Sequence, residues 1–254
     1  MIFKNFEELI EKNIRNTEKK NIAVVCADED HTLHAIMKAG QDGIAKPLLI
    51  GDKSKIEEAV KPYRRYCDYE IIAAESEEET LKKTVELVHS GKADAIMKGR
   101  IQTADLMRAI VSEENGLRTG QLMSHMLVFE VPTYHKLLCI ADAAMVTYPD
   151  LDKKKQIIKN TVGALKGMGF DDVNVAVLAA VDHVNPKMPE SVEADELKQL
   201  NGTNEIPGCY IEGPISYDLA VNKESSKIKG YESPVAGEAD MLLCHSITVA
   251  NSLV

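Results

Sequence analysis

Short apolar runs alternate with amphipathic segments through the first part of the chain. The runs are rich in Ile, Val and Ala and are too short for helices, so they predict buried strands. The expected strands are 22–27, 47–51, 69–74 and 93–97. The segments before and between them repeat apolar residues at helical spacing. The expected helices are 3–14, 28–40, 53–63 and 77–90. Regular alternation of strand and helix predicts a mainly parallel sheet flanked by helices.

The rest of the chain continues this pattern after one hairpin. Apolar runs on both sides of Pro132 predict an antiparallel pair, 126–131 with 137–141. The further strands expected are 174–181, 209–215 and 239–244, the second of them broken by Gly213-Pro214. The further helices expected are 151–169, 190–200, 217–229 and 246–254. We therefore expect an α/β protein of two domains, 1–132 and 133–254, each with a mainly parallel sheet flanked by helices.

Composition and charge narrow the classes of partner. The 254 residues are 44% apolar, which is enough for a large core without disulfides or metals. The net charge of −10 argues against nucleic acid and anionic membranes, because both attract clustered Lys and Arg. No apolar run approaches the roughly 20 residues of a membrane span. Five scattered cysteines without a C-x-x-C pair predict no zinc site and a cytoplasmic location.

The segment after the fourth strand carries the main candidate chemistry. Lys98-Gly99 ends the strand, and ligands of such sheets bind beyond the carboxyl ends of the strands. Gly99 allows backbone angles closed to other residues and close approach of a ligand. Thr103 is a favoured N-cap residue, and a helix that starts there would offer free N–H groups to an anion. Arg108 and Arg118 add forks suited to phosphate or carboxylate. The alternative is that these cations are solvated helix and loop charges.

Ser124-His125 is a weaker candidate for catalysis. No G-x-S-x-G elbow surrounds Ser124. Neighbouring residues of a strand also point to opposite faces, which hinders a Ser–His hydrogen bond. Binding of a ligand phosphate, or of the loop itself, is therefore the preferred interpretation.

Two aspartates follow predicted strands, where open α/β sheets place site residues. Asp142 and Asp218 could act as bases or metal ligands, or as a turn residue and a surface helix residue. The residues alone leave these alternatives open. The sequence contains neither a G-x-G-x-x-G fingerprint nor a G-x-x-x-x-G-K-[ST] loop. A dinucleotide site or a P-loop ATPase therefore has no support.

Several ordered motifs together resemble the phosphate acetyl/butyryltransferase family, and its phosphate butyryltransferase branch is the closer match. They include Lys98-Gly99, Arg108-Ala109, Leu117-Arg118-Thr119-Gly120, Ser124-His125 and Ser233-Pro-Val-Ala-Gly-Glu-Ala-Asp240. The resemblance implies two domains like those of isocitrate and isopropylmalate dehydrogenases, a cleft between them and a homodimer or higher homo-oligomer. It also implies the reaction acyl-CoA + phosphate = acyl phosphate + CoA, on a short, butyryl-like acyl group. Coenzyme A is then a substrate, and neither a metal nor a tightly bound cofactor is expected.

The same resemblance implies which residues bind the substrates. Arg108 would hold phosphate or CoA, and the remaining candidates would shape the site. The full set of expected substrate-binding residues is Lys98, Gly99, Thr103, Arg108, Arg118, Thr119, Ser124, His125, Asp142, Glu212, Gly213, Pro214 and Asp218.

The sequence departs from the family pattern at Ala141, Glu212 and Ala250-Asn251, and it stops at Val254. The family continues with a segment that returns to the first domain and carries the general base, so no catalytic residue is assigned here. Loss of a general base typically costs about 10²–10⁴ in rate. This leaves a second hypothesis, a non-catalytic CoA- or acyl-phosphate-binding protein of the same fold. A dehydrogenase of the related fold is a third and weaker hypothesis. It would need paired Asp metal ligands and a nucleotide-binding loop, which the sequence does not show.

Overall fold

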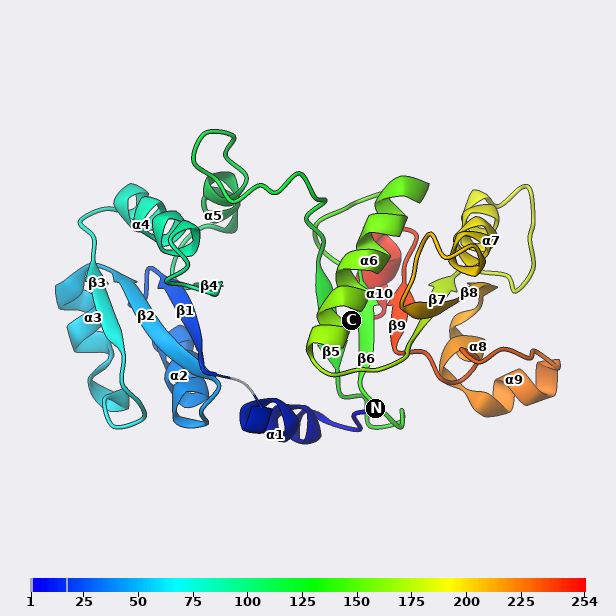
Figure 1. Ribbon diagram of the computed structural model, residues 1–254, viewed down its shortest axis with the longest axis horizontal. Coiled ribbons are helices and arrows are strands. Elements are labelled where there is room, and N and C mark those ends of the chain that lie inside the picture. The colour runs from blue at the N-terminus through cyan, green and yellow to red at the C-terminus, as the bar shows by residue number, and fades with distance from the viewer. Residues whose placement is uncertain (1, 17) are drawn as a thin grey trace. The chain divides into compact units, whose positions relative to one another are not determined.

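The computed structural model describes residues 2–16 and 18–254. The chain divides into two compact units, whose elements are labelled in Figure 1. One unit is Ile14–Gly120, here called the 14–120 unit. The other combines Met1–Asn13 with Gln121–Val254 and is called the 121–254 unit. Each has its own sheet and its own core.

The 14–120 unit contains a parallel sheet of the order β3-β2-β1-β4. Its strands are β1 (Lys20–Val25), β2 (Ala45–Gly51), β3 (Glu70–Ala73) and β4 (Ala95–Lys98). Its helices are α2 (Asp30–Gln41), α3 (Lys53–Ala59), the 3₁₀ turn η1 (Lys61–Tyr63), α4 (Glu77–His89) and α5 (Thr103–Ile110). The chain steps from β1 to β2 to β3, then crosses back to place β4 on the free side of β1. The order therefore reverses between β1 and β4, the place where α/β sheets open a crevice for ligands.

Apolar side chains of β1 point alternately to the two faces of this sheet, and helices cover both faces. Val24 packs with residues of α2 and α3, such as Leu33 and Ile56. Ala23 points to the opposite face and packs with Leu87 of α4. Successive strand residues point to opposite faces, so an unbroken apolar run is required when both faces are buried. The parallel sheet predicted from the runs is confirmed.

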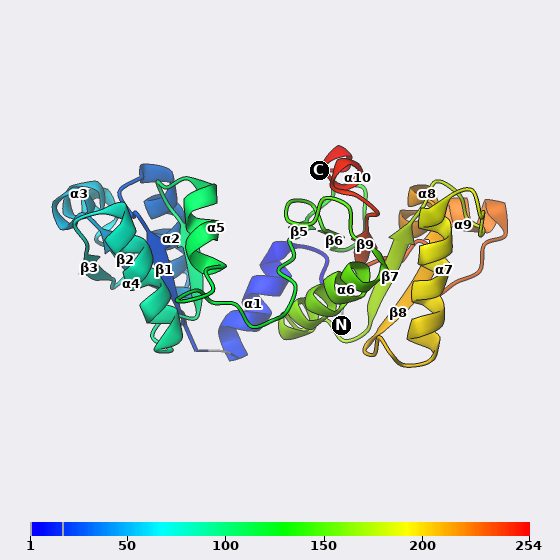
Figure 2. The same cartoon turned by 90° about the horizontal axis from the view of Figure 1, so that it is seen from above.

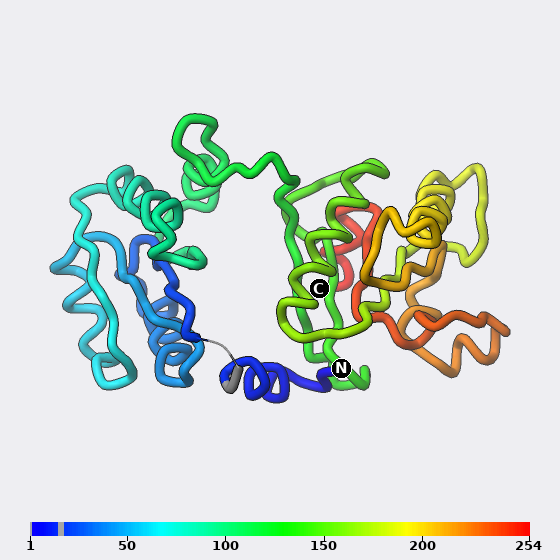
Figure 3. The backbone as a smooth tube through the Cα atoms, in the orientation of Figure 1, coloured from blue at the N-terminus to red at the C-terminus, as the bar shows by residue number. Residues whose placement is uncertain are grey.

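The 121–254 unit contains a mixed sheet of the order β5-β6-β9-β7-β8. Its strands are β5 (Met126–Phe129), β6 (Leu138–Ala141), β7 (Val173–Leu178), β8 (Cys209–Ile215) and β9 (Met241–Leu243). The helices are α1 (Phe6–Asn16), α6 (Leu151–Gly167), α7 (Pro189–Gly202), α8 (Tyr217–Val221), α9 (Lys223–Lys229) and α10 (Ile247–Ser252). Among the strands that the structure describes, only β5 and β6 pair antiparallel, which confirms the predicted hairpin traced in Figure 3. Helices α6 and α7 cover one face and α8 and α10 the other, as Figure 2 shows.

The first residues of the chain pack on the 121–254 unit. Phe3 is buried, its ring lies 5.0 Å from that of Phe170, and its carbonyl accepts a hydrogen bond from the Leu137 N–H at 2.8 Å. The predicted boundary at residue 132 also falls inside the β5–β6 hairpin. The unit boundary therefore lies at Gly120, and the N-terminal segment is not part of the first sheet's unit as 1–132 had implied. The return of the N-terminal segment to the later unit is not visible in local periodicity.

Two predicted elements differ in the structure. The helix expected at 217–229 is two helices, because Asn222 has extended backbone angles and its side chain caps α9 by accepting from the N–H groups of Glu224 and Ser225. The strand expected to break at Gly213-Pro214 instead continues to Ile215 as β8. Its pairing with β7 shifts register at that point: Gly213 and Pro214 stand opposite the single residue Val177, so β8 holds one extra residue as a bulge.

Candidate functional site

Lys98 and Gly99 end β4 at the carboxyl edge of the first sheet. The Lys98 ammonium donates to the Gly99 carbonyl at 3.3 Å. Gly99 is buried, and a Cβ there would lie 2.4 Å from the Val25 carbonyl oxygen and 2.5 Å from that of Cys26. The expected left-handed backbone angles are wrong for this residue, and the neighbouring strand already requires a glycine here. Close approach of a ligand to Gly99 stays a prediction.

Arg108 lies on α5 and is 75% exposed. Its guanidinium pairs with Asp105 one turn earlier, with 2.6 Å between Nη1 and Oδ1. Thr103 is the first residue of α5, whereas the N-cap position belongs to Gln102, whose side chain makes no capping hydrogen bond. The expected start of the helix near Thr103 is confirmed, but the N-cap assignment is wrong by one residue, and the first N–H groups of α5 receive no side-chain cap from Gln102.

Arg108 also lines a groove between α4 and α5. The groove has a volume of about 810 Å³. Leu81, Val85 and Ala109 supply apolar surface, while His89 and several carboxylates supply polar atoms. Lys98 and Arg118 do not line it. This groove gives Arg108 a concave setting of the size usual for small-molecule sites.

Arg118 and Thr119 lie in the exposed segment that follows α5. Arg118 is 57% exposed and pairs with the more exposed Glu113 at 3.2 Å. Exposed pairs of this kind contribute little stability, typically about 0–1 kcal/mol. Both arginines therefore remain available to an anion that offers a stronger charge than their present partners. Their role in substrate binding stays a prediction.

Asp142 organises the segment that contains Ser124 and His125. It is 1% exposed and follows β6. Its Oδ1 accepts from the N–H groups of Ala144 and Met145, and its Oδ2 accepts from the His125 N–H, at 2.7–2.8 Å. Three backbone N–H groups compensate the burial of this carboxylate. The sequence left open whether Asp142 is a base or metal ligand or a turn residue. These contacts support the turn residue.

Ser124 and His125 have separate surroundings. The Ser124 hydroxyl accepts from the Asn160 amide of α6 at 2.9 Å. The His125 Nδ1 is buried and has no hydrogen-bond partner among the described residues. A buried ring nitrogen without a partner costs free energy, so a ligand or water that reaches it would be stabilised there.

Two candidate carboxylates lie in and just after β8 and have separate partners. Glu212 is 6% exposed, and its Oε1 accepts from Lys198 Nζ at 2.6 Å and from the Tyr231 hydroxyl at 3.1 Å. Asp218 accepts from the Ser216 hydroxyl and pairs with Lys229, and these contacts hold the pKa of Asp218 below its usual range. Both acids therefore have polar partners in the folded chain.

Gly213 and Pro214 of the same motif lie within β8. A Cβ on Gly213 would lie 2.8 Å from the Val177 Cβ and 3.1 Å from the Ala194 Cβ. This glycine is required because β7 and α7 leave no room for a side chain. Packing alone explains the residue type, and ligand binding at Gly213 and Pro214 stays a prediction.

The sequence reasoning missed a cavity beyond the carboxyl ends of the first sheet. The carboxyl-edge cavity has a volume of about 420 Å³. It is lined by Cys26, Ala27, Asp28, Gly51, Asp52, Lys55, Ala74, Glu75, Ser76, Glu77, Thr80 and Arg100. Asp28 Oδ1 is buried without a partner among the described residues. Arg100 directly follows the Lys98-Gly99 pair. Its position after the end of a strand could have identified it as a candidate site residue.

The cysteines behave as core groups. Burial raises the pKa of the Cys139 and Cys244 thiols to about 12 and that of Cys209 to about 11. All five thiols are free. Among residues 2–16 and 18–254, no cluster of three potential metal ligands occurs, and none of the described helices is both long and apolar enough to cross a bilayer.

The chain is a two-unit α/β protein, because each unit has a sheet with parallel strands and helices on both faces. A branched-chain phosphotransacylase from Enterococcus faecalis has the same fold, with a TM-score of 0.78, 25% identity, and coverage of 92% of this chain and 82% of that chain. A phosphotransacetylase from Streptococcus pyogenes, at 20% identity and a TM-score of 0.74 over 97% of this chain and 83% of its own, supports the fold alone.

Sequence comparison identifies the family. Residues 67–252 match the family described as phosphate acetyl/butaryl transferase, and the chain belongs to it. Phosphate butyryltransferase of Clostridium acetobutylicum is 38% identical over 98% of this chain and 83% of its own length. Phosphate acetyltransferase of Thermotoga maritima is 37% identical over 97% of this chain and 83% of its own. The family predicted from the motifs is confirmed.

Proposed function

We propose that the chain is a phosphate acyltransferase that exchanges phosphate and coenzyme A on a short, butyryl-like acyl group. The observation that carries this proposal is the match over nearly the whole chain to phosphate butyryltransferases. Coenzyme A enters as a substrate, and no tightly bound cofactor takes part. The proposed setting is the cytoplasm, which the five free thiols support. The proposed assembly is a homodimer or higher homo-oligomer.

The proposed reaction is a direct transfer in a ternary complex. The sulfur of CoA attacks the carbonyl carbon of the acyl phosphate, and the bond from that carbon to the phosphate oxygen breaks. The bonding electrons leave with the phosphate, while the thiol proton passes to a base. A thiol with a pKa of roughly 8.5 is mostly protonated at neutral pH, so the reaction needs that base. No residue of this chain is assigned to the role.

The reaction also needs positive charge near the departing phosphate, which the candidate cations are proposed to supply. Negative charge builds up on the departing phosphate, and fixed positive groups lower the barrier where charge develops. Arg108 fits this part because its fork offers two parallel N–H groups and its present partner, Asp105, is a surface pair. Arg118 and Lys98 are proposed to bind the remaining anionic groups of the substrates.

The deciding assay measures thiol release from butyryl-CoA with and without inorganic phosphate. Phosphate-dependent release, with butyryl phosphate as the second product, is the expected result. If phosphate does not change the rate and calorimetry detects CoA binding, the chain is a binding protein of the same fold. Absence of both turnover and binding would overturn the proposal.

A further inference from the structure

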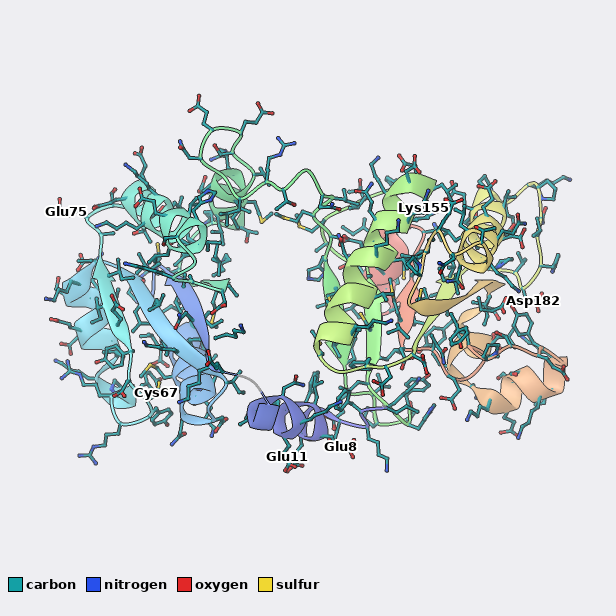
Figure 4. All side chains as sticks on the ribbon, viewed as in Figure 1. Glu8, Glu11, Cys67, Glu75, Lys155 and Asp182 are labelled. Atoms are coloured by element: carbon teal, nitrogen blue, oxygen red, sulfur yellow. The ribbon has the colours of Figure 1, made fainter. Side chains whose placement is uncertain are left out.

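A second cavity opens at the other end of the first sheet. This amino-edge cavity has a volume of about 430 Å³. It is built by the entries to β1 and β2, the end of α2 and the turn before β3, all within the 14–120 unit. Figure 4 labels Cys67, which lines it, and Glu75, which lines the carboxyl-edge cavity, and the two lie at opposite ends of β3. The two cavities are therefore separate sites.

The amino-edge cavity is strongly basic in an acidic protein. Four cationic side chains line it, Lys19, Lys46, Arg64 and Arg65, and its one carboxylate is Asp68. This gives a formal charge of +3, whereas the whole chain carries −10. The carboxyl-edge cavity has the opposite balance, with two cations and four carboxylates. A cluster of like charges repels itself, so it is stabilised when an anion binds.

These cations are not consumed by ion pairs. Among the described residues, Lys19, Lys46 and Arg65 have no carboxylate oxygen within the 4.0 Å of an ion pair. Arg64 donates to the neutral Glu57 carbonyl at 3.2 Å. Other lysines nearby are paired, as in Lys20–Asp94, Lys38–Asp42 and Lys61–Glu58. The cavity therefore holds several cations that no ion pair among the described residues neutralises.

The base of the cavity is closed by tight packing. A Cβ on Gly40 would lie 2.2 Å from Cys67 Sγ, so the glycine lets this side chain pack against α2. Burial raises the pKa of the Cys67 thiol, and the charge of Lys19 acts against that rise. The Lys19 ammonium is therefore close enough to act on a group at the base of the cavity. The end of α2 contributes only about half a negative charge, too little to offset the cations.

We propose that the amino-edge cavity binds a small anion with two linked phosphate groups, either inorganic pyrophosphate or the diphosphate of a nucleotide. Two linked phosphates match the charges, which come from separate segments and so spread across the cavity. Arginine forks suit phosphate oxygens, and lysines add point charges. The volume lies within the range of small-molecule sites. Because it lies at the opposite edge of the sheet from Arg100 and Gly99, the bound anion is an effector of the 14–120 unit and not the reacting acyl phosphate.

Calorimetry with pyrophosphate at constant ionic strength tests the proposal. All proteins carry Arg108→Ala, which removes binding at the proposed substrate site. The double variant Lys46→Gln/Arg65→Gln is compared with the matched control Lys53→Gln/Lys92→Gln, which removes the same number of charges elsewhere. We expect the first to weaken binding about 100-fold and the second to leave it nearly unchanged. Equal affinity in both variants, or no binding to the parent, would overturn the proposal.

Alkylation of Cys67 gives a readout confined to the cavity. Iodoacetamide modification is followed peptide by peptide, with the half-buried Cys26 and Cys209 as internal controls. Pyrophosphate or ADP should slow modification of Cys67 alone, because a bound anion covers the thiol and disfavours its thiolate. ADP distinguishes a nucleotide from a free diphosphate, and protection by either supports the site. Slowing of all three thiols alike, or of none, would contradict it.

Discussion

At the scale of single residues, burial and hydrogen bonding separate groups that hold the fold from groups free to bind. Asp142 is buried and bonded to three backbone N–H groups, whereas Arg108 is exposed beside one carboxylate. The sequence placed both residues in the substrate site by the same family resemblance. Only the contacts show that the first has a full structural role and that the second can exchange its partner.

Substitution of Asp142 by Asn should destabilise the protein by about 1–3 kcal/mol. The amide retains one oxygen and places an NH₂ group against a backbone N–H that needs an acceptor. Urea unfolding of Asp142→Asn and of the exposed control Asp152→Asn measures the difference. Equal midpoints for the two variants would show that the buried bonds matter little.

At the scale of elements, close backbone approach fixes residue types that periodicity cannot explain. Gly99 tolerates no Cβ because the carbonyl oxygens of Val25 and Cys26 lie within 2.5 Å of its position. Runs of apolar residues correctly predicted the parallel strands of the first sheet, since burial on both faces demands them. The same runs could not predict which strand is adjacent to which, because register and order are set by contacts distant in the sequence.

The β1–β4 contact predicts that Gly99→Ala destabilises the chain by about 1–3 kcal/mol, because the methyl group overlaps rigid backbone. Gly163→Ala is the control, since nothing lies within 4 Å of its Cβ position inside α6. The control should be neutral or stabilising by about 0.4–1 kcal/mol. Thermal unfolding of the two variants tests this, and a Gly99→Ala protein as stable as its parent would refute the steric argument.

The entry to β4 predicts a dependence on pH. Asp94 accepts from the Asn21 N–H at 2.8 Å, and this bond, with the charge of Lys20, holds its pKa below the ordinary value of 3.8. Because the pKa of Asp94 is lower in the folded state, its ionised form stabilises the fold at pH values above the pKa of the unfolded state. That stabilisation is lost as the pH falls through the pKa of the folded state. The parent should be more stable than Asp94→Asn near neutral pH and should lose this extra stability between about pH 5 and pH 3. Unfolding midpoints across this range should converge, and a constant gap would contradict the assignment.

At the scale of the whole chain, each unit has its own sheet and core, and the first residues belong to the later unit. The sequence predicted two α/β parts and the β5–β6 hairpin, but its boundary at residue 132 divided that hairpin and placed the N-terminal segment with the first sheet. The place of the N-terminal segment depends on Phe3 meeting Phe170, a contact that no local pattern reveals.

Separate cores predict that thermal unfolding departs from a two-state transition. The calorimetric enthalpy should exceed the van't Hoff enthalpy, because the two units can lose their packing at different temperatures. Differential scanning calorimetry measures both quantities. Equal enthalpies and a single symmetric peak would mean that the units unfold as one.

The kinetics of Arg108→Ala test the central claim most directly. Phosphate-dependent release of CoA from butyryl-CoA is measured for the parent, Arg108→Ala and the exposed control Lys53→Ala. We predict that Arg108→Ala lowers kcat/KM for phosphate by about 10²–10³ while the control keeps the parent value. A phosphate-dependent activity that survives Arg108→Ala undiminished would contradict the account.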